Sequence, residues 1–198
     1  MQPTENHDAL IGFSGFVGST LLGQRPFQSR FNSQNIGDIE GRRFDTVVCC
    51  AAPAQKWIAN RDPAADRANM DRLIGHLKTM ICQRFVLIST VDVFKSPVGV
   101  TEETPVDEEG LHAYGLHRRL LEKFVADRFS AHLILRLPGL VGPGLRKNVL
   151  YDFLHGNQLH KIDSRIVMQF YPMVNLCYDL ETALDAGLSL LHLTAEPI

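Results

Sequence analysis

Hydrophobic residues along this chain follow two alternating patterns. Short continuous apolar runs are typical of strands buried on both faces of a parallel sheet, whereas apolar positions three or four residues apart are typical of helices with one buried face. The runs predict strands at Asp8–Ile11, Phe27–Phe31, Thr46–Ala52, Phe85–Thr90, Leu133–Leu137 and Leu190–Thr194. The helical pattern predicts helices at Phe16–Leu22, Ala64–Ile81, Ala113–Phe129 and Asp179–Leu191. This alternation favours an α/β fold, a doubly wound parallel sheet.

Length, composition and charge narrow the classes of function. A chain of 198 residues suits one domain, and the acidic stretch Thr101–Gly110 is expected to be a surface loop. The formal net charge of -2, without a long basic run, argues against nucleic acid or an acidic membrane as partner. Neither a membrane-spanning apolar stretch nor a signal peptide is recognisable, so we expect a cytoplasmic protein.

Cysteine and histidine positions give no sign of a metal site. Cys49, Cys50, Cys82 and Cys177 form no CxxC pair, so we expect free thiols in a reducing compartment. The eight histidines show no metal-ligand spacing, and we expect His112 and His117 to be ordinary surface residues. We therefore predict no bound metal.

A glycine-rich loop follows the first predicted strand. Gly12, Gly15 and Gly18 form a GxxGxxG pattern that opens a helix. Glycine there permits a tight turn, lets backbone approach a pyrophosphate and brings helix and strand close together, while the helix N-terminus offers free N–H groups. No lysine follows Gly18, which argues against a P-loop. The loop predicts a dinucleotide site; the alternative is a tight turn without a ligand.

Further segments occur in the order typical of one family. They are Gly37-Asp38-Ile39, VVCCAAP at Val47–Pro53, RANMDRL with Asn69, LISTVDVF ending near Thr90, YGLHR at Tyr114–Arg118 and LRLPGLVGPG at Leu135–Gly144. With the glycine loop, they resemble the extended short-chain dehydrogenase/reductases, a group of nucleotide-sugar epimerases, dehydratases and reductases. The similarity extends from about residue 8 to about residue 194.

The resemblance implies a Rossmann domain over residues 1–198 that binds NAD or NADP and acts on a sugar or nucleotide sugar. Residues 139–182 would form a small substrate-side region, because the C-terminal lobe of the family is reduced here. The implied catalytic residues are Thr90, Tyr114 and Arg118. The implied cofactor contacts are Gly12, Ser14, Gly15, Phe16, Val17, Gly18, Arg30, Asp38, Ile39, Ala51, Ala52, Pro53, Arg118 and Pro138.

The roles implied for these side chains agree with elementary chemistry. Tyr114 and Arg118 are four residues apart and share one helix face. A phenol with a pKa of about 10 is a poor base at neutral pH. We expect the nearby cation to lower the pKa of Tyr114 and Thr90 to position the substrate oxygen. The alternatives are a buried structural tyrosine and a surface arginine.

The resemblance is incomplete in ways that affect function. Arg118 replaces the lysine of the family's YxxxK signature, and no acid follows the second predicted strand. Arg30 lies there instead, and an arginine can accept a 2′-phosphate, so we prefer NADP. A second hypothesis is a non-enzymatic dinucleotide-binding module, such as a sensor or an assembly subunit. Hydride exchange with a substrate would distinguish the two.

Several weaker candidates and one interface complete the expectations. The family commonly dimerises through the equivalents of Ala64–Ile81 and Ala113–Phe129, and Leu121 and Val125 are predicted to lie partly off the main apolar stripe of the second helix, so we expect a homodimer. Other candidates, each with a structural alternative, are Lys147 and Asn148 for a substrate phosphate, Trp57 beside the cofactor, and Gln169, Tyr171 and Asp179 on the substrate side.

Overall fold

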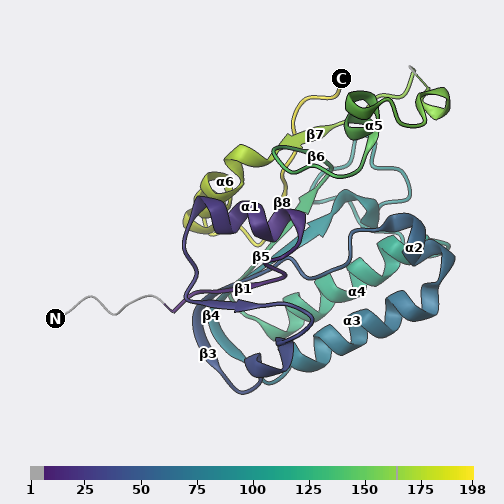
Figure 1. Ribbon diagram of the computed structural model, residues 1–198. Coiled ribbons are helices and arrows are strands. Elements are labelled where there is room, and N and C mark those ends of the chain that lie inside the picture. The colour runs from purple at the N-terminus through teal and green to yellow at the C-terminus, as the bar shows by residue number, and fades with distance from the viewer. Residues whose placement is uncertain (1–6, 164) are drawn as a thin grey trace.

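A six-stranded parallel sheet forms the centre of the computed structural model, which describes residues 7–163 and 165–198 (Figure 1). Its six strands lie in the order β2-β1-β3-β4-β5-β8. Their bounds are Ser29–Phe31 (β2), Ala9–Ile11 (β1), Arg43–Cys49 (β3), Ile81–Thr90 (β4), His132–Leu137 (β5) and Leu190–His192 (β8). Every pairing in this sheet is parallel. The predicted doubly wound α/β fold is confirmed.

Helices cover both faces of the sheet, as Figure 1 shows. The helices α1 (Phe16–Gln24) and α6 (Leu176–Asp185) pack on one face, and α3 (Pro63–Leu77) and α4 (Ala113–Arg128) pack on the other. Alternate strand residues supply the two cores: Ile11 faces α3, whereas Leu10 faces α1. The strands are apolar on both faces for this reason.

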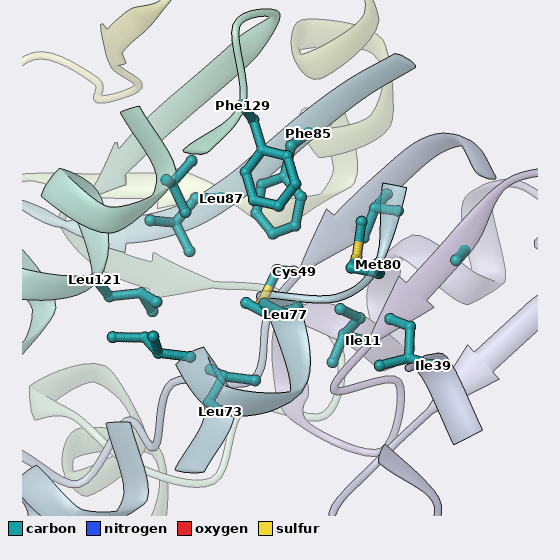
Figure 2. Packing of buried hydrophobic residues seen from close by; sticks show 14 of the residues in the cluster. Ile11, Ile39, Cys49, Leu73, Leu77, Met80, Phe85, Leu87, Leu121 and Phe129 are labelled. Atoms are coloured by element: carbon teal, nitrogen blue, oxygen red, sulfur yellow. The ribbon is translucent and has the colours of Figure 1, made fainter. Parts of the chain in front are cut away.

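The core under α3 and α4 corrects one argument for a dimer (Figure 2). The rings of Phe85 and Phe129 stack there with centroids 4.3 Å apart. Leu121 and Val125, which were expected to lie partly off the main stripe of α4, are both fully buried in this core. The argument from these two residues is therefore wrong, because they form the centre of the buried face.

The connections reverse the strand order at β1. From β1 the chain moves to β2 on one side and then crosses to β3 on the other side of β1. Ligands of open α/β sheets bind where the strand order reverses in this way. Residues that follow β1, β3, β4 and β5 all lie at this edge, because these strands are parallel.

A second, smaller sheet is formed by the chain beyond β5. The strands β6 (Gly139–Val141) and β7 (Phe170–Pro172) form a two-stranded parallel sheet, and the helix α5 (Val149–His155) lies between them in sequence. These elements, and the short helix α2 (Lys56–Arg61), carry too few residues to give a periodic apolar signal. The sequence did not predict them.

Some predicted boundaries are wrong by several residues. The helix α3 ends at Leu77, and β4 already begins at Ile81, so the end of the predicted helix Ala64–Ile81 belongs to the next strand. The predicted helix Asp179–Leu191 lies instead at Leu176–Asp185. Gly187, at a φ of +68°, follows it in the left-handed conformation that commonly terminates helices.

Candidate functional site

Two glycines of the loop after β1 are required by packing. Gly12 has a φ of +84°, and a Cβ there would lie 2.7 Å from the carbonyl carbon of Cys50. A Cβ on Gly18 would lie 2.2 Å from the carbonyl oxygen of Gly12. The loop therefore folds tightly over the end of β3, and α1 packs directly on the turn that precedes it.

Gly15 differs, because the surrounding protein atoms leave room for a Cβ at this position. A Cβ at Gly15 would contact only the carbonyl oxygen of Gly12, at 3.4 Å, and both Ser14 and Gly15 are exposed. The helix α1 begins at Phe16 with no side-chain cap and no acid in its first turn. The N–H groups of a first helical turn lack intrahelical partners and favour anions. The glycine cradle, which consists of the Gly12–Gly18 loop and the start of α1, therefore fits a pyrophosphate.

The end of β2 carries no carboxylate. Arg30 is exposed on this edge strand, and Asn32 and Asn35 shape the turn that follows. The Oδ1 atom of Asn32 accepts a hydrogen bond from the Gln34 N–H at 2.9 Å, and Asn35 Nδ2 donates to the Arg30 carbonyl at 3.0 Å. The segment from Ser29 to Asn35 contains no Asp or Glu, so it offers no carboxylate to hold a ribose 2′-hydroxyl.

One predicted cofactor contact is not available to a ligand. Ile39 is fully buried against the core under α3, so its side chain stabilises the fold instead. Its neighbour Asp38 is exposed. The remaining predicted contacts lie at the carboxyl edge and are half-buried: Ala51, Ala52 and Pro53 follow β3, and Pro138 follows β5.

Thr90 and Tyr114 belong to elements that pack against each other. Thr90 ends β4, and its Oγ1 accepts a hydrogen bond from the Asp92 N–H at 3.1 Å. Tyr114 lies in the first turn of α4 and is mostly buried. A Cβ on Gly115 would lie 2.2 Å from the Asp92 carbonyl oxygen, so glycine lets α4 approach the 3₁₀ turn Val91–Val93. Gly115, directly after Tyr114, is a sequence signal for this close contact that the sequence analysis did not use.

Arg118 is buried and held on several sides, so the alternative of a surface arginine is wrong. Its side chain is 2% exposed. The atom Nη1 lies 2.5 Å from Asp66 Oδ2, and Nη2 donates to the Pro53 carbonyl oxygen at 2.5 Å. The guanidinium carbon lies 4.0 Å from the centroid of the Tyr114 ring. Arg118 therefore connects α3, α4 and the segment after β3.

Asp66 is the functional residue that sequence reasoning missed. It lies on α3 in register with the buried positions Met70, Leu73 and Leu77, and an acid on such a stripe is a signal that could have been used. His117 Nδ1 lies 2.7 Å from the same oxygen that Arg118 binds. His117 is buried, which corrects the expectation of a surface histidine, and His112 caps α4 by accepting the Gly115 N–H.

These charges change the proton affinities of the site. Burial raises the pKa of Asp66, but hydrogen bonds from Arg118 and His117 outweigh burial and hold that pKa below its usual value. Burial also raises the pKa of Tyr114 and is the largest effect; Arg118 lowers this pKa, the Asp92 and Asp66 carboxylates raise it, and a hydrogen bond with Thr90 lowers it. Arg118 does lower the pKa of Tyr114, as expected, but burial outweighs this effect and the resulting pKa lies above the usual value.

The loop after β6 gives different roles to two weaker candidates. The side chain of Asn148 caps α5: its Oδ1 accepts the Leu150 N–H at 3.0 Å, while its Nδ2 donates to the Leu140 carbonyl at 2.8 Å. Asn148 is therefore structural. Lys147 donates from Nζ to the Ala54 carbonyl oxygen, close to the segment that follows β3, and partial burial lowers the pKa of its ammonium group.

The other weak candidates have surroundings of their own. A cavity of about 390 Å³ lies between β7, α6 and the segment after β8, and Tyr171 and Asp179 line it, joined by a hydrogen bond of 2.5 Å. Its lining includes none of the implied catalytic or cofactor residues. Gln169 donates to the Ala195 carbonyl, and Trp57 is exposed on α2 beside Arg61. Asn69 is exposed on α3.

Within the described ranges, no three His, Cys, Asp or Glu side chains are grouped as a metal site would require. In the same part of the chain, no helix combines the length and apolar character needed to cross a membrane.

Comparison with known proteins identifies the class of fold. No protein-family model and no curated protein matches the chain. Solved structures do match. A dTDP-4-dehydrorhamnose reductase from Bacillus anthracis in complex with NADP has a TM-score of 0.76 at 15% identity, with 99% of this chain and 77% of that chain covered. A UDP-N-acetylglucosamine 4-epimerase from Methanobrevibacter ruminantium in complex with UDP-N-acetylmuramic acid has a TM-score of 0.77 at 12% identity, covering 98% and 78%.

A third structure, the Bordetella bronchiseptica enzyme WbmH in complex with NAD+, has a TM-score of 0.70 at 16% identity, covering 98% and 77%. At these identities the similarity shows the fold. The chain has a Rossmann-type fold, and in particular the one shared by these nucleotide-sugar reductase and epimerase structures.

Proposed function

We propose that this chain is an NAD(P)-dependent oxidoreductase that acts on a nucleotide-sugar type of substrate. One observation carries the proposal. The glycine loop, the uncapped start of α1 and Thr90 all lie at the same edge of the sheet. The end of α4 that carries Tyr114 packs against the turn that follows Thr90. The activities and ligands named for the solved structures of the same fold support this choice. Fold alone does not establish activity, so the catalytic side chains provide the test.

The chain's own residues would hold the dinucleotide along this edge. Backbone N–H groups at the start of α1 would bind the pyrophosphate, with Gly15 leaving room for it. When bound, the nicotinamide donates or accepts a hydride. The set that would surround the dinucleotide is Gly12, Ser14, Gly15, Phe16, Val17, Gly18, Asp38, Ala51, Ala52, Pro53 and Pro138. Arg30, with no acid nearby on β2, supports a preference for NADP.

The two catalytic hydroxyls have complementary tasks. Thr90 Oγ1 accepts the Asp92 N–H, so its own proton can be donated to the Tyr114 hydroxyl or to a substrate oxygen. Tyr114, whose pKa is raised chiefly by burial, keeps its proton at neutral pH and can donate it to the same oxygen. The two groups would position a carbonyl and neutralise the charge that develops on its oxygen.

A second candidate function is a dinucleotide-binding module without catalysis. The ion pair with Asp66 favours it, because that pair neutralises the cation that is expected to assist Tyr114. Stopped-flow hydride transfer over a panel of nucleotide sugars, for the wild type and Tyr114→Phe, decides between the two. We expect transfer with at least one substrate and a loss of at least about 100-fold in the variant. Tight dinucleotide binding with no reacting substrate would instead establish the binding module.

A homodimer through α3 and α4 is part of this proposal. The half-exposed apolar residues Leu116, Leu120 and Phe124 recur every four residues along α4 and support it, because such a row suits contact with a second helix pair. Light scattering at high micromolar concentration tests it, and a mass equal to one chain contradicts it.

A further inference from the structure

The carboxylate of Asp66 is the buried centre of a three-residue cluster. One oxygen, Oδ2, lies 2.5 Å from Arg118 Nη1 and 2.7 Å from His117 Nδ1. The side chains of Asp66 and Arg118 are 5% and 2% exposed. Burying a guanidinium without a counter-charge would cost folding free energy, so the Asp66 carboxylate holds the Arg118 guanidinium at this position.

The cluster fixes the direction in which Arg118 points. Its Nη1 is bound to Asp66 and its Nη2 to the Pro53 carbonyl oxygen, and the guanidinium lies over the face of the Tyr114 ring at 4.0 Å from the centroid. Nε is buried and has no partner among the described residues. No hydrogen bond between this guanidinium and the Tyr114 hydroxyl is formed in the described structure, and the contact with the ring is a cation–π contact.

We propose that Asp66 is a positioning residue that holds Arg118 against the face of the Tyr114 ring and offsets its charge, so that Tyr114 serves as the proton donor of a carbonyl reduction. The role in reduction rests on the function proposed above. In that step a reduced nicotinamide dinucleotide, held at the start of α1, would supply the hydride that the carbonyl carbon receives. The π pair moves to the oxygen, and the oxygen takes the hydroxyl proton of Tyr114. Solvent then returns a proton to the tyrosinate.

The charged groups around Tyr114 come from every element packed against it. Asp92 lies in the turn after β4 and is paired with Lys56 of α2 at 2.6 Å. Asp66 projects from α3, Arg118 and His117 belong to α4, and the His112 ring lies 6.4 Å from the Tyr114 ring. Removing the Asp66 charge leaves the cation uncancelled while the other groups stay, which stabilises the tyrosinate.

The test is a titration of Tyr114 that needs neither cofactor nor substrate. Protein labelled with ¹³C at the tyrosine Cζ is titrated by NMR, and Tyr114→Phe assigns the signal. In Asp66→Asn we expect the Tyr114 midpoint to fall by at least about one pH unit. Asp71→Asn, on the exposed side of the same helix and paired with Arg67, is the matched control and should leave the midpoint unchanged. A Tyr114 midpoint that is unchanged or raised in Asp66→Asn overturns the proposal.

A second variant keeps the test decisive if Asp66→Asn does not fold. The double variant Asp66→Asn/Arg118→Gln removes both charges and keeps a hydrogen-bonding pair. If Asp66 offsets Arg118, the Tyr114 midpoint rises less in the double variant than in Arg118→Gln alone. Equal rises in the double variant and in Arg118→Gln mean that Asp66 does not offset the cation, and that result overturns the proposal.

Kinetics separate this inference from the proposed function. We expect Asp66→Asn to lower kcat for reduction at pH values above the new Tyr114 midpoint, with KM little changed, and Asp66→Glu to restore part of the loss. If Asp66→Asn shifts the Tyr114 midpoint but the wild type transfers no hydride, the enzymatic function is overturned and the positioning role of Asp66 stands. If the wild type transfers hydride but Asp66→Asn does not shift the midpoint, the positioning role is overturned and the enzymatic function stands.

Discussion

Arg136 of β5 and Glu122 of α4 form a buried ion pair beside β4. The Nη2–Oε2 distance is 2.7 Å and the Nε–Oε1 distance is 2.9 Å, and the side chains are 2% and 0% exposed. The Ser89 hydroxyl donates to the same carboxylate at 2.6 Å. Because Ser89 precedes Thr90, this pair attaches α4 to the strand end that carries the candidate site.

The first prediction concerns the cost of breaking this pair. Glu122→Ala leaves the Arg136 guanidinium buried without its counter-charge, and we expect a loss of about 3–5 kcal/mol in the free energy of unfolding. Asp127→Ala, on the exposed side of α4, is the control and should stay within about 0.5 kcal/mol of the wild type. Urea unfolding followed by circular dichroism measures both. Equal stability of the two variants contradicts the prediction.

The second prediction distinguishes the glycines of the loop. Gly15→Val should retain the fold, since its Cβ meets only one atom at 3.4 Å, but should abolish dinucleotide binding. Gly18→Ala should destabilise the protein, because its Cβ would lie 2.2 Å from the Gly12 carbonyl oxygen. Calorimetric titration with NADPH and thermal unfolding provide the two measurements.

Gly23→Ala is the matched control, because Gly23 lies in the same helix and no atom outside that helix's own backbone comes within 4 Å of an added Cβ. It should bind the dinucleotide normally. Unchanged affinity for NADPH in a folded Gly15→Val protein would show that the dinucleotide does not approach this loop.

The sheet and the long helices could be predicted from the sequence, whereas the buried ion pairs could not. The strands and the long helices follow from apolar runs and periodicity, since burial on both faces of the sheet requires them. Arg136 interrupts such a run, LILRL, and was included in an apolar strand, although it is buried by pairing with Glu122 from another element. The contact between Asp66 and Arg118 joins residues 52 positions apart. No local pattern gives such a pairing.

The third prediction concerns cofactor preference. If Arg30 binds a 2′-phosphate, Arg30→Gln should weaken NADPH binding by about 10-fold or more and leave NADH binding nearly unchanged, because one charge-assisted hydrogen bond contributes about 1.5–3 kcal/mol. Arg43→Gln, an exposed arginine at the opposite end of the sheet, is the control. Fluorescence titrations at physiological salt measure the dissociation constants. Parallel losses for NADPH and NADH would exclude this role.

The last prediction follows from the raised pKa of Tyr114. The phenol must be protonated to donate, so the rate of carbonyl reduction should be constant through neutral pH and should fall only as the pH rises through that pKa, above the ordinary tyrosine value of about 10. The reverse oxidation needs the tyrosinate and should rise over the same interval. A site in which Arg118 acted as an uncancelled cation would lose reduction at a lower pH than a free tyrosine. Stopped-flow rates in both directions, on Tyr114→Phe and wild type, measure the profile between pH 6 and the onset of unfolding. A reductive rate that falls with a midpoint near neutrality contradicts the prediction, because it would show that burial does not outweigh the effect of Arg118 on the Tyr114 hydroxyl.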